Sequence, residues 1–337
     1  MKSLLYIGNK LSVHGLSVTT IETLGPLLES EGYSVKYASS KKNRLFRLLE
    51  MLKVTFQLRN KVDYILIDTY STSNFWYAFF VSQLARILDV KYIPILHGGN
   101  LPNRLEKSKW FSKQIFKNSY KNVSPSQYLL EAFISNGFSN TIYIPNTIQI
   151  ENYQFKLRSK VAPKLLWVRS FAKIYNPKMA VEVFKIVKEK FPEATLCMIG
   201  PDKDGSLATT KELAKQYNLD IEFTGKLSKE EWILRATDCY IFINTTHFDN
   251  MPVSVIEAMA LGLFVVSTNV GGLNYLLEDK KDAFLVNDDD HISMAETIFF
   301  LCKNPELSLK SSQFAREKVI GFDWNFVKIN GTKRSFN

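Results

Sequence analysis

The chain has 337 residues, of which 46% are hydrophobic and 23% charged, which excludes a disordered or fibrous protein and predicts two domains. Its three cysteines, Cys197, Cys239 and Cys302, are scattered, odd in number and without metal-binding spacing, which fits a reducing cytoplasm better than a disulfide scaffold. The net charge of +10 is uneven: residues 1–160 hold 21 Lys and Arg against 10 Asp and Glu, whereas residues 161–337 hold 22 against 23. The basic first half indicates a polyanionic partner, either nucleic acid or an anionic membrane surface.

Short apolar runs alternate along the whole chain with longer segments of helical periodicity. The first run, in "MKSLLYIGNKLS", is too short for a signal peptide and is predicted to be a β-strand. Further strands are predicted at residues 33–39, 64–68, 92–99, 121–126 and 141–146, and in the second half at 164–170, 194–200, 221–225, 239–245 and 263–268. Helices between them predict parallel strands with crossover helices, in two doubly wound halves joined near residues 147–162. The longest apolar run, residues 75–81, is far shorter than a membrane span.

Two acids with seven residues between them stand in "FDNMPVSVIEAMALGLFVV", residues 248–266. Asp249 is predicted in the loop at the carboxyl end of a strand, and Glu257 about a turn and a half into the helix that Pro252 starts. Because ligands of doubly wound sheets bind at the carboxyl ends of the strands, both acids are candidate ligand contacts. The alternative is a solvated Glu257 and an Asp249 that only shapes the loop.

Residues 249–272, "DNMPVSVIEAMALGLFVVSTNVGG", resemble the signature of the GT-B glycosyltransferases in the large retaining group called family 4. Five further motifs follow the order and approximate spacing of that family. They are "LHGG" (96–99), "VSPSQYL" (123–129), "IPNTI" (144–148), "LLWVRSFAK" (165–173) and "FTGKLSKEE" (223–231).

The resemblance implies the α/β fold called GT-B, in which two Rossmann-like doubly wound domains face a cleft. It implies an acceptor-side domain over residues 1–155, a nucleotide-sugar-binding domain over 156–320, and a last segment, 321–337, that crosses back to the first domain. The implied activity is retaining transfer of a sugar from a nucleotide-sugar to a lipid-linked or saccharide acceptor. We expect this in bacterial cell-surface polysaccharide, lipopolysaccharide or glycolipid synthesis, by a cytoplasmic protein bound peripherally to the inner membrane.

The resemblance also implies roles for single residues. Glu257 would bond the ribose of the donor, Asp249 would touch hydroxyls of the transferred sugar, and the backbone of Asn250 and Met251 would face the diphosphate. Carboxylates accept bonds from paired hydroxyls, and amides at a helix start suit phosphate oxygens. Leu227, in "FTGKLSKEE", is a further expected donor contact.

Other implied roles concern charge and the first domain. Arg169 and Lys173 would neutralise the departing diphosphate, with Lys178 as the alternative to Lys173 because the family's usual "KG" is absent. His97 would bond a hydroxyl of the donor sugar, although on pattern alone it is a satisfied core histidine. Gly15, in "VHGLS", stands where the family's glycine loop approaches the diphosphate, and the match there is thin.

The sequence departs from the family pattern at three positions. Asp249 replaces the usual glutamate, Phe264 the usual proline, and Tyr275 an acid in the turn after the second glycine of "GG". These departures bear on which sugar is transferred rather than on the class of reaction.

Two segments, 41–61 and 107–121, mix Lys and Arg with Leu, Phe and Trp, as membrane-surface helices do. Core-packing helices with solvated basic faces are the alternative, and no recognition motif supports nucleic acid. The acidic clusters at 201–205 and 287–291 are predicted to cap loops, so no metal and no cofactor are expected.

Two alternatives to a transferase remain. A GT-B relative with different chemistry, such as a nucleotide-sugar epimerase or a phosphorylase, would need extra acids and histidines or a lysine for pyridoxal phosphate. The chain has only four histidines, and no motif marks such a lysine. A catalytically silent glycan- or membrane-binding protein is the other alternative, and the intact Arg169, Asp249 and Glu257 argue against it.

Overall fold

The computed structural model describes residues 2–15 and 18–329, and these form two compact units. The described part of unit 1 is residues 2–15 and 18–145, and that of unit 2 is residues 146–329. The sequence predicted the division between residues 155 and 156, which is later in the chain than the division between residues 145 and 146 that the structure shows. The predicted crossing of residues 321–337 to the first domain stays a prediction, since residues 330–337 lie outside the described residues.

Unit 1 is built on a parallel sheet with the strand order β2-β1-β3-β4-β5-β6. Its strands are β1 (Ser3–Ile7), β2 (Ser34–Ala38), β3 (Tyr64–Thr69), β4 (Tyr92–Leu96), β5 (Asn122–Ser124) and β6 (Thr141–Tyr143). Strand order reverses between β1 and β3, so the carboxyl ends of these strands flank the switch point of the sheet.

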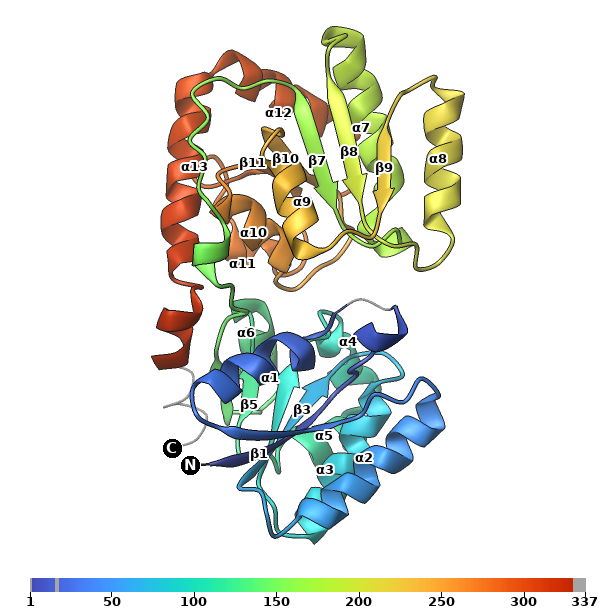
Figure 1. Cartoon of the computed structure of the whole chain (residues 1–337), viewed down its shortest axis with the longest axis vertical. Helices are drawn as coiled ribbons and strands as arrows, with labels where there is room; N and C mark the ends of the chain where they lie inside the picture. The colour runs from blue at the N-terminus through green and yellow to red at the C-terminus, as the bar shows by residue number, and fades with distance from the viewer. Residues whose placement is uncertain (1, 16–17, 330–337) are drawn as a thin grey trace. The chain divides into compact units, whose positions relative to one another are not determined.

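Helices cover both faces of this sheet (Figure 1). They are α1 (Thr20–Ser30), α2 (Arg44–Leu58), α3 (Phe75–Ile87), α4 (Leu101–Lys107), α5 (Lys109–Phe116) and α6 (Gln127–Ser135), with a short 3-10 helix η1 (Ser12–His14). Ile7 and Ile67 pack against Met51 of α2 and Val81 of α3 in one buried cluster. The intervening strand residues face the opposite side, as the alternation of side chains along a strand requires.

Unit 2 has a second parallel sheet, with the order β12-β11-β10-β7-β8-β9. Its strands are β7 (Lys164–Val168), β8 (Thr195–Ile199), β9 (Glu222–Gly225), β10 (Ile241–Asn244), β11 (Phe264–Thr268) and β12 (Phe284–Val286). Read from the other edge, this is the strand order of dinucleotide-binding Rossmann domains, and its switch point lies between β7 and β10.

The helices of unit 2 also cover both faces of its sheet (Figure 1). They are α7 (Pro177–Lys190), α8 (Ser206–Gln216), α9 (Lys229–Ala236), α10 (Val253–Ala260), α11 (Leu273–Leu276), α12 (His291–Lys303) and α13 (Pro305–Ile320), with 3-10 helices η2 (Ile150–Asn152) and η3 (Lys173–Tyr175). One buried cluster joins the sheet to α7 and α12, and another joins it to α9, α10 and α13.

The predicted α/β class with two doubly wound halves is confirmed, because both sheets are wholly parallel and each is covered on two faces. Over residues 2–15 and 18–329, none of the helices is both long and apolar enough to cross a membrane.

Candidate functional site

The switch point of unit 2 brings together two of the predicted site residues. Arg169 directly follows β7, and Asp249 lies in the loop that follows β10. Arg169 Nη2 donates a hydrogen bond to Asp249 Oδ2, and the two side chains are 14% and 17% exposed. The strand order therefore joins residues that stand 80 positions apart in the sequence.

Glycines hold the two loops against their neighbours. A Cβ at Gly271 would lie 2.2 Å from the carbonyl oxygen of Asp249, and one at Gly272 would lie 1.9 Å from that of Asn250. The amide of Gly272 donates to the Asp249 carbonyl at 2.9 Å. Gly200 lies equally close to Arg169, because its Cβ would be 1.8 Å from the Arg169 carbonyl oxygen. Only glycine fits at these positions, so the loops that carry Arg169 and Asp249 are fixed by backbone contact.

Besides the Nη2 that bonds Asp249, the guanidinium of Arg169 has a second donor, Nε, that no described residue accepts. Its Cζ lies 4.9 Å from the centre of the Tyr175 ring, in cation–π contact. Its Nε is buried and has no hydrogen-bond partner within the described part of the chain. A buried donor without a partner is costly, and a planar guanidinium suits phosphate oxygens. The arrangement is therefore suited to an anionic ligand.

Asn250 and Met251 form the turn between Asp249 and α10. The Asn250 amide donates to Asp249 Oδ1 at 2.8 Å, so Asp249 uses one oxygen on this turn and the other on Arg169. The carbonyl of Met251 accepts a bond of 3.0 Å from the side-chain amide of Asn146. Both Asn250 and Met251 are buried, which fixes the start of α10 beside Asp249. Their predicted contact with a diphosphate stays a prediction.

Glu257 lies in the second turn of α10 and is only 4% exposed. Its Oε1 accepts a hydrogen bond of 2.6 Å from the hydroxyl of Tyr153 and a second one from Lys229 Nζ. Burial raises the pKa of the Tyr153 hydroxyl well above its usual range, and the charge of Glu257 raises it further. The alternative of a solvated Glu257 is wrong, since this carboxylate is buried and held by two donors.

Lys173 and Lys178 are both exposed, the first in η3 and the second at the start of α7. The backbone amide of Lys173 donates to the Asp204 carboxylate at 3.0 Å, so the η3 loop is tied to the loop after β8. Leu227, half-buried between β9 and α9, packs against the cluster beneath α10. The choice between the two lysines and the donor contact of Leu227 stay predictions.

The two acidic clusters cap loops, as predicted. Asp204 accepts bonds from the backbone of Lys173 and Ser206, and the Ser206 and Lys173 bonds lower the pKa of its carboxyl. Asp290 caps α12 by accepting a bond of 2.9 Å from the Ser293 amide. Within residues 2–15 and 18–329, no three His, Cys, Asp or Glu side chains gather in a way that would hold a metal ion.

In unit 1, His97 follows β4 and donates from Nε2 to Asp68 Oδ1 at 2.8 Å. Asp68 belongs to β3 and is completely buried, and Tyr6 donates to the same oxygen at 3.0 Å. A Cβ at Gly8 would lie 2.7 Å from Asp68 Oδ2, so glycine leaves room for the carboxylate. The interpretation of His97 as a hydrogen-bonded core histidine is confirmed for one ring nitrogen, Nε2, which bonds Asp68. The predicted bond from His97 to a donor sugar stays a prediction.

Gly15 ends η1 with a φ of 78°, a backbone conformation that favours glycine. A Cβ there would meet no atom within 4 Å, so this glycine is required by the turn rather than by close approach of the described residues. Residues 16 and 17 lie outside the described residues, and the donor contact of Gly15 stays a prediction.

Three residues of these sites were not predicted from sequence: Asp68, Tyr153 and Lys229. Asp68 had a detectable signal, because it is an acid inside the apolar run "YILID" of a strand predicted to be buried. Lys229 lies in the quoted motif "FTGKLSKEE", which could have indicated it, whereas Tyr153 carries no such signal; both meet Glu257 only through the folding of unit 2.

Part of this chain is similar to known glycosyltransferases. An uncharacterised glycosyltransferase of Haemophilus influenzae is 26% identical over 191 residues, which are 55% of this chain and 51% of that protein. The UDP-Gal:α-D-GlcNAc-diphosphoundecaprenol α-1,3-galactosyltransferase of Escherichia coli is 24% identical over 204 residues, 55% of this chain and 50% of that protein. The aligned part of the chain thus spans about half the length of these curated relatives.

Solved structures show the same fold across the whole chain. Sucrose-phosphate synthase from Thermosynechococcus elongatus aligns with a TM-score of 0.82 at 17% identity, over 99% of this chain and 98% of that one. HepE from Anabaena in complex with UDP-glucose aligns with a TM-score of 0.79 at 16% identity, over 100% of both chains. These neighbours confirm the predicted GT-B fold.

The family described as glycosyl transferases group 1 matches residues 149–318, which contain both strands of the unit 2 switch point together with Arg169, Asp249 and Glu257. Because the match extends over half of the chain and the fold agrees with it, the chain belongs to the glycosyl transferases group 1 family.

Proposed function

We propose that this protein is a glycosyltransferase that moves a sugar, with retention of anomeric configuration, from a nucleotide-sugar to a lipid-linked or saccharide acceptor. The observation that carries the proposal is the meeting of Arg169 and Asp249 at the switch point of unit 2, where such folds bind nucleotides. The E. coli relative is named for a UDP-sugar donor and a diphosphoundecaprenol acceptor, and HepE was solved with UDP-glucose. We therefore take a uridine diphosphate sugar as the donor class.

The leaving diphosphate would bind at Arg169, whose buried Nε is without a partner in the described chain. When the bond between sugar and phosphate breaks, negative charge grows on the leaving oxygen, and a fixed guanidinium stabilises that charge more than it stabilises the bound donor. Lys173, four residues on in the η3 loop, would add a second positive charge. We expect no metal requirement, because these two side chains supply the positive charge that the leaving group needs.

Glu257 and Asp249 would hold the two sugar ends of the donor. The carboxylate of Glu257 is oriented by Tyr153 and Lys229, which bond one oxygen and leave the other for ribose hydroxyls. Asp249 holds the guanidinium of Arg169 in place and also accepts a bond from the Asn250 amide. We propose that its carboxylate oxygens accept hydrogen bonds from hydroxyls of the transferred sugar as well. His97 of unit 1, oriented by Asp68, would bond a hydroxyl of a donor sugar.

Retention follows from the roles that these side chains take. None of the residues assigned here acts as a nucleophile on the sugar. The acceptor hydroxyl would approach the face that the diphosphate leaves, its oxygen would form the new bond, and a leaving-group oxygen would take its proton. Both the broken and the new bond then lie on one face of the sugar ring.

The first test is a thermal-shift screen with UDP, UDP-glucose, UDP-galactose and their GDP counterparts, since a ligand that binds the folded state raises the unfolding temperature. The best donor is then incubated with diphosphate-lipid and saccharide acceptors, and the new linkage is assigned by NMR. An inverted linkage would refute retention. An epimerised nucleotide-sugar without transfer would favour the epimerase, and stabilisation by no nucleotide or nucleotide-sugar would refute the donor site.

A further inference from the structure

One face of unit 1 exposes an unusual amount of apolar surface. Eight large hydrophobic side chains of α2, α3 and α5 are between 38% and 80% exposed. We call them the outer face: Leu45, Phe46, Leu49 and Phe56 of α2, Trp76, Phe80 and Ile87 of α3, and Trp110 of α5. Scattered exposed hydrophobic residues are ordinary, but adjacent ones on neighbouring helices indicate a contact surface.

Helix α2 is apolar on two sides. Met51 faces the core and is completely buried, whereas Leu45, Leu49 and Phe56 recur at spacings of four and seven residues and are 63%, 52% and 51% exposed. A helix at the surface of a globular protein needs only one apolar stripe, which it buries against the core. The second stripe of α2 therefore has no function in the packing of unit 1.

Helix α3 repeats this pattern. Val81 and Ala85 are completely buried in the core, while Trp76, Phe80 and Ile87 face outward at spacings of four and seven residues. Helix α3 packs against α2 on one side and α5 on the other (Figure 1). The three helices that carry the exposed side chains are therefore neighbours.

Trp110 of α5 extends this surface. Its ring lies 6.2 Å from that of Phe79, and the ring of Trp76 lies 5.1 Å from that of Phe111. The two tryptophans are thus joined through an aromatic cluster between α3 and α5. Tryptophan at the edge of an apolar surface is typical of proteins that contact the interface of a membrane.

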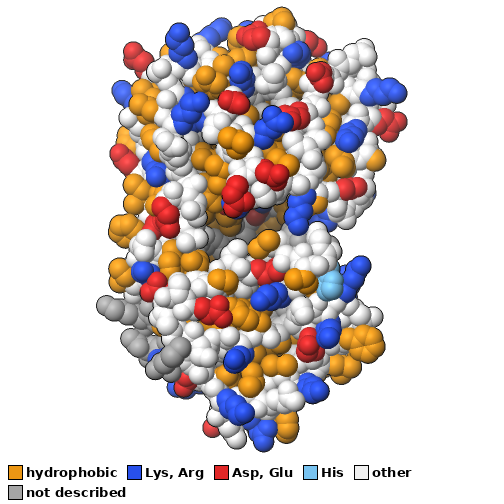
Figure 2. Space-filling view, in the orientation of Figure 1, with side chains coloured by type: hydrophobic (Ala, Val, Ile, Leu, Met, Phe, Trp, Pro, Cys, Tyr) orange, Lys and Arg blue, Asp and Glu red, His pale blue; other side chains and the backbone are white. Residues whose placement is uncertain are grey.

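The charges on the helices of the outer face are mostly positive. Helices α2, α3 and α5 contain one acid among them, Glu50, which accepts a hydrogen bond from Ser39. Their exposed basic residues are Arg44, Lys53, Arg86, Lys109 and Lys113. Figure 2 shows orange hydrophobic side chains beside blue Lys and Arg side chains over α2.

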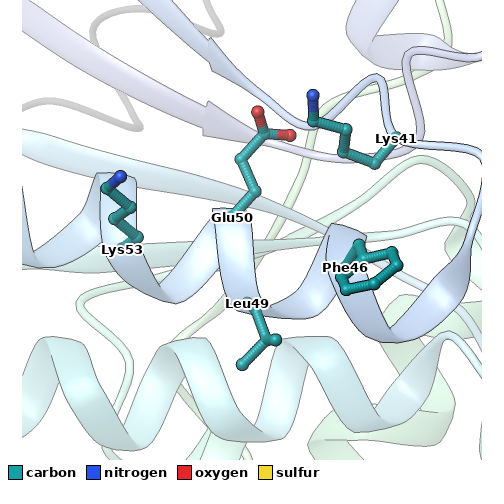
Figure 3. Close-up of a pocket in the computed structure, with 5 residues that line it drawn as sticks. All are labelled: Lys41, Phe46, Leu49, Glu50 and Lys53. Atoms are coloured by element: carbon teal, nitrogen blue, oxygen red, sulfur yellow. The ribbon is translucent and has the colours of Figure 1, made fainter.

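A shallow pocket of about 500 Å³ combines both properties. It is lined by Lys41, Phe46, Leu49, Glu50 and Lys53. Figure 3 shows Leu49 and Glu50 pointing to opposite sides of α2, with Glu50 and Lys41 extending to the same side. Two apolar side chains and Lys53 of α2 thus lie beside Lys41 of the preceding loop.

We propose that the outer face binds the surface of an anionic lipid bilayer. Its Leu, Phe and Trp side chains would enter the boundary between headgroups and acyl chains, and the surrounding Lys and Arg would contact anionic headgroups. A second copy of the chain is a poor occupant, because two faces of the same positive sign would repel each other. Nucleic acid would leave the exposed apolar stripes unburied. This inference is independent of the reaction proposed above.

The first experiment is sedimentation with vesicles of phosphatidylcholine, with and without phosphatidylglycerol, at low and high salt. We expect binding that needs phosphatidylglycerol and weakens with salt, because surface charges are screened beyond about 10 Å at 0.1 M. The variant Leu49→Gln/Phe56→Gln should bind about ten-fold more weakly or worse, through lost apolar insertion. The matched control is Leu234→Gln/Ile292→Gln in unit 2, where the two residues are 70% and 56% exposed, and it should bind as the unchanged protein does.

The second experiment reports the orientation of unaltered protein. Of the five tryptophans, Trp167, Trp232 and Trp324 are at most 7% exposed, and the other two, Trp76 and Trp110, lie on the outer face. Lipids brominated in their acyl chains should therefore quench part of the fluorescence, and Trp76→Phe/Trp110→Phe should abolish that quenching.

Four results would overturn the proposal. They are binding to neither kind of vesicle, equal binding to both, equal loss of binding in the control variant, and vesicle binding without tryptophan quenching. A dimer that Leu49→Gln/Phe56→Gln converts to a monomer would also overturn it, because a second copy would then cover the outer face. Equal unfolding temperatures of the variants exclude misfolding as the cause of lost binding.

Discussion

The two units use the same kind of sheet to hold different polar pairs. In unit 2, Arg169 and Asp249 pair beyond the carboxyl ends of β7 and β10, and both side chains keep some exposure, 14% and 17%. In unit 1, His97 pairs with Asp68 inside the strand β3, where the side chains are 9% and 0% exposed. Both side chains of the first pair can be reached from solvent, whereas in the second pair the carboxylate is enclosed and only His97 keeps some exposure.

The difference in burial indicates a difference in role. A buried carboxylate is costly unless it is hydrogen-bonded, and Asp68 is held by Tyr6 and His97. Burial raises the pKa of the Tyr6 hydroxyl well above its usual range, and Asp68 raises it further, so Tyr6 stays a donor. Asp68 is therefore placed to orient His97, whereas Arg169 is placed to meet a ligand.

The largest expected effect is that of Arg169→Ala. Removing a group that stabilises developing charge costs about 10²- to 10³-fold in turnover, and we expect that loss in kcat with a much smaller change in the KM for donor. Steady-state rates of UDP release from the best donor measure both. Arg235→Ala is the control, because Arg235 is 52% exposed and pairs with the exposed Glu222. Full activity of Arg169→Ala would mean that the diphosphate binds elsewhere.

The next largest effect is expected for the pair of His97 and Asp68. Asp68→Asn should lower kcat about 10- to 100-fold, because the amide keeps an acceptor oxygen but lacks the charge that fixes the His97 ring. The KM for donor should change less. The exposed Asp63, at the start of the same strand, supplies the control Asp63→Asn.

A double variant tests whether Asp68 affects kcat by orienting His97. If Asp68 acts through His97, Asp68→Asn should have little further effect on kcat in a His97→Ala background. Additive losses would show that Asp68 acts independently of His97, and the contrast between the two pairs would then be wrong.

Sequence patterns predicted the parallel architecture of both units, because strand and helix signals are local. They also predicted that Asp249 lies in the loop after a strand and Glu257 in the helix that follows, because loop and helix are adjacent in the sequence. They did not predict β12, which has three residues, or α13, whose polar and apolar residues lack a clear period. Such short or weakly patterned elements are defined by packing rather than by local sequence.

The sequence also did not predict hydrogen-bond partners that come from distant parts of the chain. Tyr153 and Glu257 are 104 positions apart, and Lys229 and Glu257 are 28 apart. No period or motif links them, since their meeting depends on the whole topology of unit 2. The Arg169–Asp249 contact was missed for the same reason, although both residues were predicted as site residues.

A smaller effect is expected for Glu257→Gln. The oxygen that Tyr153 and Lys229 leave for the ribose belongs to a charged carboxylate, and an amide carries no such charge, so donor binding should weaken by about 1–3 kcal/mol. Isothermal calorimetry with the best donor measures it, and Glu212→Gln on the exposed side of α8 is the control. An unchanged affinity would remove Glu257 from the donor site and leave it as a structural partner of Tyr153 and Lys229.

The smallest effect is that of Tyr153→Phe, which keeps the buried ring and removes one hydrogen bond to Glu257. The free energy of unfolding should fall by about 1–2 kcal/mol, as for a bond to a charged acceptor whose second donor, Lys229, remains. Donor affinity should fall less than in Glu257→Gln. Chemical denaturation at neutral pH gives the first value, and Tyr217→Phe is the control.

Alkaline pH sharpens this test, because the folded structure raises the pKa of Tyr153 through burial and the charge of Glu257. Above about pH 10 the unfolded chain loses this proton while the folded protein keeps it, so the stability that Tyr153 contributes is present below pH 10 and is lost as pH rises. The unchanged protein should therefore lose about 1.4 kcal/mol per pH unit more than Tyr153→Phe does, and the gap between the two should close. A constant gap from pH 8 to pH 11 would mean that the Tyr153 hydroxyl is not buried against Glu257.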